Sequence, residues 1–211
     1  MARRMERAWA APMFHLTISV DMGSAMARSQ RTPGVTVTDV IIRECALALV
    51  RHPSLNAHYV GYDEGIIEFG DQNIGVAVAT DAGLMVPVIR RAAELTDGQI
   101  STRRKDLVER ARSGRLGVED VLDGTFTISN LGMFGIDRFD AIINPPQVAI
   151  LAVGQIGARV MIEKGKVIAK DVAELTLTCD HRATDGAGGA RFLRALRDGL
   201  DGTAAGDGTG E

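Results

Sequence analysis

The stretch CDHRATDGAGG, residues 179–189, places a thiol, an imidazole and two carboxylates within seven positions and then continues into glycines. The imidazole of His181 is the group best matched to proton transfer at neutral pH, since an unperturbed histidine titrates near that range. A single histidine more often has a structural or surface role, so its neighbours decide the interpretation. Asp185 stands four positions on, directly before Gly186, where a carboxylate would cap a helix that starts there. His181 is therefore a candidate for proton transfer, and Asp185 could cap the helix, fix the geometry of the loop that carries His181, or do both.

Cys179 offers a different chemistry, because a cysteine near a histidine could form a nucleophile–base pair. However, residues two apart on one strand have little freedom to align, and ELTLTC (residues 174–179) has the pattern of a buried strand end. A cysteine in such a place packs as a small hydrophobic side chain. The hypothesis of a metal site built from Asp180, His181 and Asp185 has even less support than a nucleophilic Cys179, because no second histidine or cysteine cluster supplies the remaining ligands. We expect an inert Cys179 and no metal.

GTFTISNLGMFG, residues 124–135, is the second informative stretch. GTFTIS is typical of a strand with outward-facing hydroxyls, and a loop punctuated by glycines follows it. The nucleophile elbow of hydrolases needs Gly-x-Ser-x-Gly, which this stretch lacks. One interpretation is a buried strand followed by a glycine turn. The alternative is that Ser129 presents its hydroxyl at the strand end, beside backbone that glycine lets a ligand approach closely.

The elements that must position these groups follow from the hydrophobic periodicity. Strands are predicted at residues 14–21, 66–69, 74–80, 84–89, 124–129, 148–153, 158–163 and 174–179. Helices are predicted at residues 38–53, 96–116 and 190–200. The first helix has Thr38 or Asp39 as its expected cap, and Gly114 is a candidate stop for the second. Strands and helices interleave without strict βαβ alternation, which favours an α+β fold with a mixed sheet.

The composition limits the classes of molecule that the chain is expected to bind. The chain of 211 residues is 45% hydrophobic and 24% charged, which is typical of a folded globular protein. Its formal charge of −3 gives no signal of polyanion binding, so we expect no nucleic acid partner. No apolar run approaches the roughly 18–20 residues that a membrane span needs, and the N-terminus lacks the apolar core of a secretory signal. The two cysteines allow a single disulfide, but reduced thiols in a cytoplasm-like compartment are the simpler interpretation.

Four stretches, taken together and in order, resemble the catalytic domain of dihydrolipoyl acyltransferases, the core components of 2-oxo acid dehydrogenase complexes. They read VTVTDVIIRECALALVRHPSLNA, NIGVAVATDAGLMVPVIRRA, GTFTISNLGMFGIDRFDAIINPPQVAILAVGQI and LTLTCDHRATDGAGGARFL. The resemblance extends from Arg3 to about Leu200. We therefore expect an acyltransferase catalytic domain at residues 1–201, incomplete at its N-terminus relative to the family, and a disordered tail at residues 202–211.

The resemblance implies a chloramphenicol-acetyltransferase-like α+β fold, a mixed sheet with flanking helices that serves as a trimeric building block. Its active site would lie in a channel between two subunits, which CoA enters from one side and a lipoyl arm from the other. The histidine of the family matches His181, its aspartate matches Asp185 and its hydroxyl residue matches Ser129. The early arginine of an Arg-x-Trp pattern matches Arg7, before Trp9, and would support the site by pairing with Asp185.

The implied reaction transfers an acyl group between S-acyl-dihydrolipoamide and CoA without a metal. In it, His181 would act as the base for attack of the thiol on the thioester, and the Ser129 hydroxyl would stabilise the oxyanion. The Ser-Asn-Leu-Gly sequence favours an acetyl or branched-chain type. The lipoyl group would come from a lipoyl domain that this chain does not contain. Expected partners are copies of the chain, as a homotrimer alone or within a 24-mer or 60-mer cage, and the decarboxylase and dihydrolipoyl dehydrogenase components. The expected location is the bacterial cytoplasm, or the mitochondrial matrix in a eukaryote. Two alternatives remain: a non-catalytic assembly scaffold, and an O-acetyltransferase of the same fold.

Overall fold

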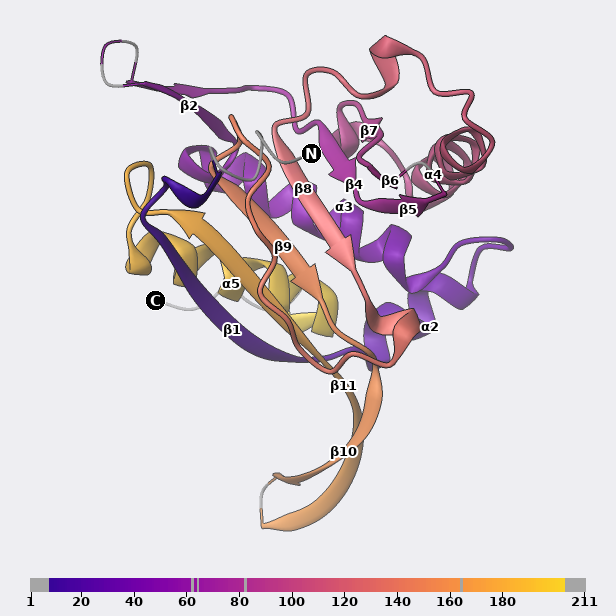
Figure 1. The fold of residues 1–211 in the computed structure, drawn as a ribbon. Coiled ribbons are helices and arrows are strands. Elements are labelled where there is room, and N and C mark those ends of the chain that lie inside the picture. Colours follow the sequence, from indigo (N-terminus) through magenta and orange to yellow (C-terminus); the bar gives the residue numbers. More distant parts are fainter. Residues whose placement is uncertain (1–7, 62, 64, 82, 164, 204–211) are drawn as a thin grey trace.

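The computed structural model describes residues 8–61, 63, 65–81, 83–163 and 165–203. Its largest element is a mixed sheet with the strand order β1–β11–β9–β8–β4–β7, and β10 pairs with β11 (Figure 1). These strands are β1 (Met13–Asp21), β4 (Ile74–Val76), β7 (Val88–Ile89), β8 (Phe126–Asn130), β9 (Ala149–Val153), β10 (Gly157–Glu163) and β11 (Lys166–Asp180). Strand β8 is parallel to β4 and β9, whereas the other neighbouring pairs are antiparallel.

Two short hairpins lie outside this sheet. They are β2 (Ala57–Gly61) with β3 (Gly65–Glu68), and β5 (Val78–Thr80) with β6 (Gly83–Met85). The predicted strands at residues 74–80 and 84–89 are therefore each divided, because their two halves pair with different neighbours. The alternation of apolar residues indicated extended chain there, but it carried no information on where one sheet ends and another begins.

The helices α3 (Val37–Arg51) and α5 (Gly186–Asp201) lie against one face of the sheet and contact each other (Figure 1). Helices α2 (Gly23–Gln30) and α4 (Asp97–Arg112) pack beside α3, and short 3₁₀ turns occupy residues 53–55, 92–94, 118–120 and 132–134. The predicted α+β class, a mixed sheet with flanking helices, is confirmed. Among the described residues, no helix is long and apolar enough to span a membrane.

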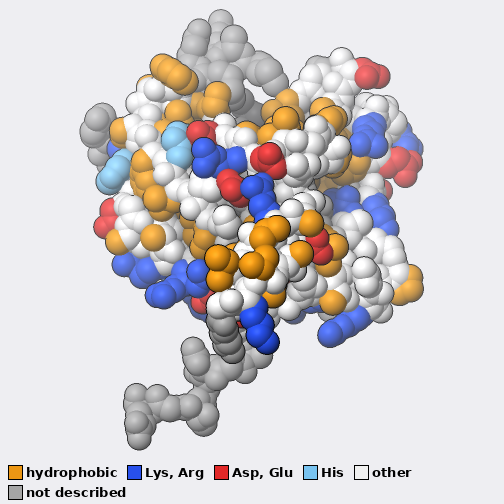
Figure 2. Space-filling view, turned by 90° about the horizontal axis from the view of Figure 1, so that it is seen from below, with side chains coloured by type: hydrophobic (Ala, Val, Ile, Leu, Met, Phe, Trp, Pro, Cys, Tyr) orange, Lys and Arg blue, Asp and Glu red, His pale blue; other side chains and the backbone are white. Residues whose placement is uncertain are grey.

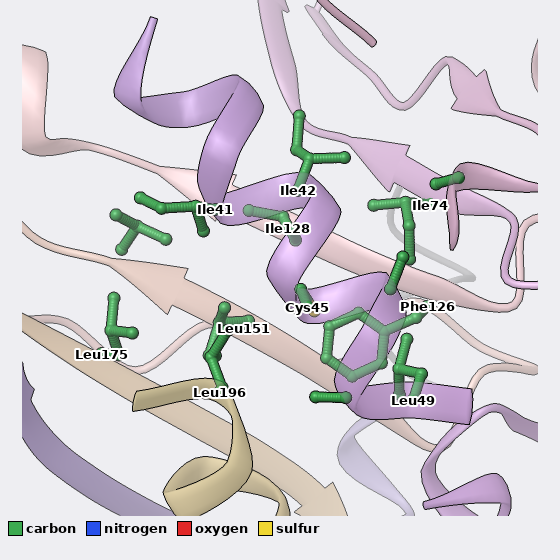
Figure 3. Close-up of a cluster of buried hydrophobic side chains, with 14 of the residues drawn as sticks. Ile41, Ile42, Cys45, Leu49, Ile74, Phe126, Ile128, Leu151, Leu175 and Leu196 are labelled. Carbon is green, nitrogen blue, oxygen red and sulfur yellow. The ribbon is translucent and has the colours of Figure 1, made fainter. Parts of the chain in front are cut away.

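The main core lies between the sheet and these two helices. Ile41, Cys45 and Leu49 recur every four residues along α3, so they line one buried helix face, and Cys45 and Leu49 lie beside Phe126 of β8 (Figure 3). Leu196 contributes from α5 to the same cluster. Burial of one such Leu, Ile or Phe side chain stabilises the fold by about 1.5–3 kcal/mol, which holds the two helices on the sheet.

The opposite face of the sheet carries a smaller apolar cluster and a layer of buried hydroxyls. Ile150 and Ala152 of β9 pack there against Ile143. Thr127 of β8, which was predicted to face outward, is buried and donates its hydroxyl hydrogen bond to Gln147 Oε1 at 2.5 Å. That prediction was wrong because periodicity identifies the two faces of a strand but not what covers them. The covering segment, residues 131–148, crosses this face (Figure 1).

Helix α3 starts earlier than predicted, because Thr36 is its N-cap and not Thr38 or Asp39. The Asp39 carboxylate accepts the backbone N–H of Thr36 at 2.8 Å, which forms one half of a capping box. Asp39 is buried and also accepts Arg104 Nε at 2.6 Å, so the start of α3 is joined to α4. Burial alone would raise the pKa of Asp39, but the bonds from Arg104 and Thr36 lower it below its usual value.

The β10–β11 hairpin extends away from the rest of the protein (Figure 1). Its register pairs Val160 with Ala169 and Ile162 with Val167, so these four side chains share one face. Val160, Ile162 and Val167 are 76%, 78% and 72% exposed. Seen from below, the side from which the hairpin extends, hydrophobic side chains gather near the middle of the molecule (Figure 2). An exposed apolar face of this kind marks a contact surface.

Candidate active site

His181 lies in the turn directly after β11, and its side chain is exposed. Its backbone N–H donates to the carbonyl oxygen of Pro12 at 2.9 Å, and its ring packs on Phe14 with the centroids 4.7 Å apart. The residues on either side form an ion pair, since Arg182 Nε lies 2.9 Å from Asp180 Oδ1. The Arg182 guanidinium also stacks 3.7 Å above the centre of the Tyr59 ring. The backbone that carries His181 is therefore held on both sides.

Asp185 caps α5, as the sequence predicted. Its carboxylate accepts the backbone N–H of Gly188 at 2.7 Å. A Cβ on Gly189 would lie 2.8 Å from Leu16 Cδ1, so glycine at this position lets the first turn of α5 approach β1 closely. The cap and the close approach together fix where the His181 turn ends and the helix begins. The catalytic roles of His181 and Asp185 stay predictions.

Cys179 is fully buried on β11 between Phe14 of β1 and Ala149 of β9. Burial, with a smaller contribution from the Asp180 charge, raises the pKa of its thiol to about 12. The thiol is therefore protonated at neutral pH, whereas a nucleophilic cysteine must be a thiolate. Cys179 packs as the small hydrophobic side chain that the sequence predicted.

Ser129 lies near the end of β8, beside a cavity of about 240 Å³. The cavity has mostly apolar walls, formed by β4, β5, β6, α4 and the turn after β8. Asn130 fixes the backbone beyond the serine, because its side chain donates to Thr38 Oγ1 at 3.2 Å and accepts the N–H of Gly132 at 2.9 Å. This arrangement presents a hydroxyl to a partly enclosed space, as the second interpretation of the sequence required.

The glycines after Ser129 serve close contact between backbone segments. A Cβ on Gly132 would lie 2.8 Å from the carbonyl oxygen of Gly154, and a Cβ on Gly154 would lie 1.9 Å from that of Asp137. No other residue fits either position without moving the backbone. The expectation that glycine here lets a ligand approach is therefore wrong for Gly132, whose open side is filled by residues of the same chain.

A single chain does not bring His181 and Ser129 together. Through β9, the strand register places Ser129 level with Thr176 of β11. His181 lies five residues beyond Thr176, which corresponds to roughly 16 Å along a strand. The C-terminal ends of β8 and β11 point in opposite directions, so His181, beyond the end of β11, lies away from Ser129 near the end of β8. A site that uses both groups therefore needs two copies of the chain.

Arg7, predicted to support the site by pairing with Asp185, lies outside the described residues. Within the described ranges, no group of three or more His, Cys, Asp or Glu side chains is arranged to hold a metal ion. The sequence did not single out the Asp180–Arg182 pair or its stacking on Tyr59. The acid and base that flank His181 were the available signal, but Tyr59 is distant in sequence and could only be placed by the fold.

The profile of one protein family, described as 2-oxoacid dehydrogenases acyltransferase (catalytic domain), matches residues 1–205. The chain belongs to this family. A curated relative, the mitochondrial dihydrolipoyllysine-residue acetyltransferase component of the pyruvate dehydrogenase complex of Schizosaccharomyces pombe, is 41% identical over 197 residues. That match covers 88% of this chain and 40% of the relative, so the chain spans less than half of the relative's length.

The fold is similar to those of two solved structures. The dihydrolipoamide acetyltransferase of Azotobacter vinelandii superimposes with a TM-score of 0.90 at 33% identity, over 97% of this chain and 88% of that one. A chloramphenicol acetyltransferase superimposes with a TM-score of 0.60 at 14% identity, over 94% of each chain. The second likeness shows the fold alone, and it confirms the predicted chloramphenicol-acetyltransferase-like architecture.

Proposed function

We propose that this chain is an acetyltransferase catalytic domain that transfers an acetyl group between S-acetyl-dihydrolipoamide and CoA. One observation carries the proposal. The Azotobacter vinelandii structure was studied for the role of a serine, a histidine and an asparagine in catalysis, in which the histidine follows the serine by 52 positions and precedes the asparagine by four. In this chain His181 follows Ser129 by the same 52 positions and precedes Asp185 by four. The third residue differs, because an aspartate stands here in place of an asparagine.

The site we propose is shared between two protomers of a homotrimer. The separation of roughly 16 Å along the sheet means that His181 of one protomer must face Ser129 of the next. The exposed apolar face of the β10–β11 hairpin supports assembly, because side chains such as Val160 and Ile162 are seldom left in water over a continuous surface. The trimer, alone or within a larger cage, would form the core of a complex in which a lipoyl domain delivers the substrate.

The proton transfer assigned to His181 fits the chemistry of the nucleophile. A CoA thiol titrates at about pH 8.5 if it behaves like a free cysteine, so most of it is protonated at neutral pH. A neutral imidazole removes that proton as the sulfur attacks the thioester carbonyl of S-acetyl-dihydrolipoamide. The held backbone around His181, with Asp180 and Arg182 on either side, keeps the ring in place for this step.

The hydroxyl of Ser129 is assigned to the charge that develops on the substrate. When the new carbon–sulfur bond forms, the carbonyl oxygen becomes an oxyanion that can accept a hydrogen bond from this hydroxyl. Collapse of the intermediate breaks the bond to the lipoyl sulfur, which takes the proton from the imidazolium of His181. The products are acetyl-CoA and dihydrolipoamide, and no enzyme nucleophile takes part. Asp185 holds the turn through its cap on α5.

A kinetic panel tests this function. Acetyl-CoA, isobutyryl-CoA and succinyl-CoA are each offered with dihydrolipoamide, and acetyl-CoA also with chloramphenicol as the acceptor. Acetyl transfer to dihydrolipoamide should have the highest kcat/KM. Absence of transfer from all three donors would leave the scaffold role, and preference for chloramphenicol as acceptor would indicate an O-acetyltransferase. A parallel measurement of mass by size exclusion with light scattering should give a trimer or a multiple of three. A monomer that is fully active would contradict the shared site.

A further inference from the structure

Helix α4 presents one face to the cavity that contains Ser129. Arg104, Val108 and Arg112 line this cavity and are spaced four residues apart, so they form a single row along the helix. The row is cationic at both ends and apolar in its middle. The apolar residues Leu107 and Ala111, which α4 buries against the rest of the protein, lie directly beside this row on the helix surface.

Arg112 occupies a special place in this row, because it lines three neighbouring hollows. The first is the cavity of about 240 Å³ beside Ser129. The second, of about 350 Å³, lies against Ala79, Thr80 and Asp81 of the β5–β6 hairpin. The third is a groove of about 460 Å³ along α4, which Lys105 also lines. Among the described residues, Arg112 is the residue common to all three sets of walls.

The two arginines of the row differ in how their charge is used. Arg104 is bound to the buried carboxylate of Asp39, with Nε 2.6 Å from Oδ1, so its charge is neutralised within the fold. Arg112 makes no ion pair and no side-chain hydrogen bond with any residue in the described part of the chain, and its side chain is exposed. Glu109, the acidic residue nearest in sequence along the groove, is paired with Arg115 at 3.0 Å. A guanidinium that is bonded to no described residue and is exposed to solvent thus borders the cavity that contains Ser129.

We infer that Arg112 binds a phosphate group of CoA, an inference that rests on the proposed function. CoA carries its reactive thiol at one end and its phosphates at the other, so a thiol placed near Ser129 leaves the phosphates outside the cavity. A guanidinium suits this role because it forms two parallel hydrogen bonds with a phosphate. Asp81 would repel an anion in the hollow beside β5, whereas Lys105 adds positive charge on the groove side. The phosphate therefore lies on the α4 side of Arg112.

Isothermal titration of the assembled protein tests the assignment with CoA, dephospho-CoA and pantetheine. Arg112→Gln should raise the Kd for CoA about ten- to hundredfold, the loss expected for hydrogen bonds to a charged group, and should leave the affinity for pantetheine unchanged. Arg112→Lys should recover part of the loss. Arg103→Gln is the matched control, because Arg103 is an exposed arginine of the same helix that lines none of the three hollows.

Comparison of the three ligands shows which phosphate Arg112 contacts. If Arg112→Gln weakens CoA but not dephospho-CoA, the residue contacts the 3′-phosphate, and if it weakens both equally, the residue contacts the diphosphate; either supports the inference. An unchanged Kd for CoA, or an equal loss with pantetheine, overturns it while leaving acetyl transfer by the wild type intact. A wild-type protein that binds no CoA and transfers no acetyl group overturns the proposed function as well.

Discussion

Two inactive variants should restore activity when they share a trimer. His181→Ala removes the proposed base, and kcat should fall by about 10²–10⁴-fold. Ser129→Ala removes the hydroxyl at the other half of the site, and kcat should fall by about 10²–10³-fold. Each variant keeps the half that the other lacks. Because His181 and Ser129 are separated by roughly 16 Å along the sheet of one chain, neither variant can complete a site within its own chain.

The size of the recovery follows from the symmetry of a closed trimer. A trimer with two protomers of one variant and one of the other has three junctions between neighbours. One of these junctions joins two protomers of the same variant, one lacks both groups, and one combines an intact His181 with an intact Ser129. Either mixed composition therefore has one working site, so kcat per trimer should be about one third of the wild-type value. KM for CoA should not change at that site.

The assay uses co-expression of the two variants with different affinity tags and purification through both tags, which leaves only mixed trimers. Acetyl transfer from acetyl-CoA to dihydrolipoamide is followed by thioester absorbance. Wild-type chains that carry the same two tags serve as the reference for full activity. Mixed trimers of correct mass that are no more active than their parents would refute the placement of the two residues on neighbouring protomers.

Three further outcomes are expected. Cys179→Ala should keep nearly full kcat, because the thiol is protonated and inert, and should cost about 1 kcal/mol of stability in thermal unfolding. Gly154→Ala should destabilise by about 3 kcal/mol or more in urea unfolding, because its Cβ would lie 1.9 Å from a carbonyl oxygen, whereas Gly157→Ala, with nothing within 4 Å, should be neutral. Asp39→Asn should destabilise by about 3 kcal/mol at pH 7, since it leaves Arg104 without its buried partner. The folded-state pKa of Asp39 is lowered, so its contribution to the free energy of unfolding is present at neutral pH and is lost as pH falls through that pKa. The stability difference between wild type and Asp39→Asn should therefore be smaller around pH 3 than at pH 7, and an equal difference at the two pH values would contradict this assignment.

Local signals were sufficient for features that depend on neighbouring residues. The cap of α5 at Asp185 and the buried strand end at Cys179 were both predicted, because a cap and an alternation pattern need only a few adjacent positions. The same kind of signal was misread at α3. The Thr-x-x-Asp pattern from Thr36 to Asp39 is a capping box, but Thr38 also has a capping side chain and lies closer to the apolar run.

Features that depend on distant residues could not be read from the chain. The hydroxyl of Thr127 is buried because Gln147, twenty positions later, folds across it. The separation of Ser129 from His181 depends on the order and direction of β8, β9 and β11, which no local pattern encodes. Helical spacing places Arg112 in a row with Arg104, but only the packing of α4 beside β5 shows that this row borders the cavity.

The β10–β11 hairpin has a consequence for assembly and aggregation of the newly synthesised chain. A single chain carries an edge strand, β10, and a row of exposed side chains at Val160, Ile162 and Val167. Edges of this kind pair with any exposed strand, including those of unfolded neighbours. In a trimer built through this surface, correct assembly and aggregation compete for the same hairpin. The yield of soluble protein then depends on how fast protomers associate relative to how fast they aggregate. Dilution slows aggregation of the monomer, but it also slows formation of the trimer.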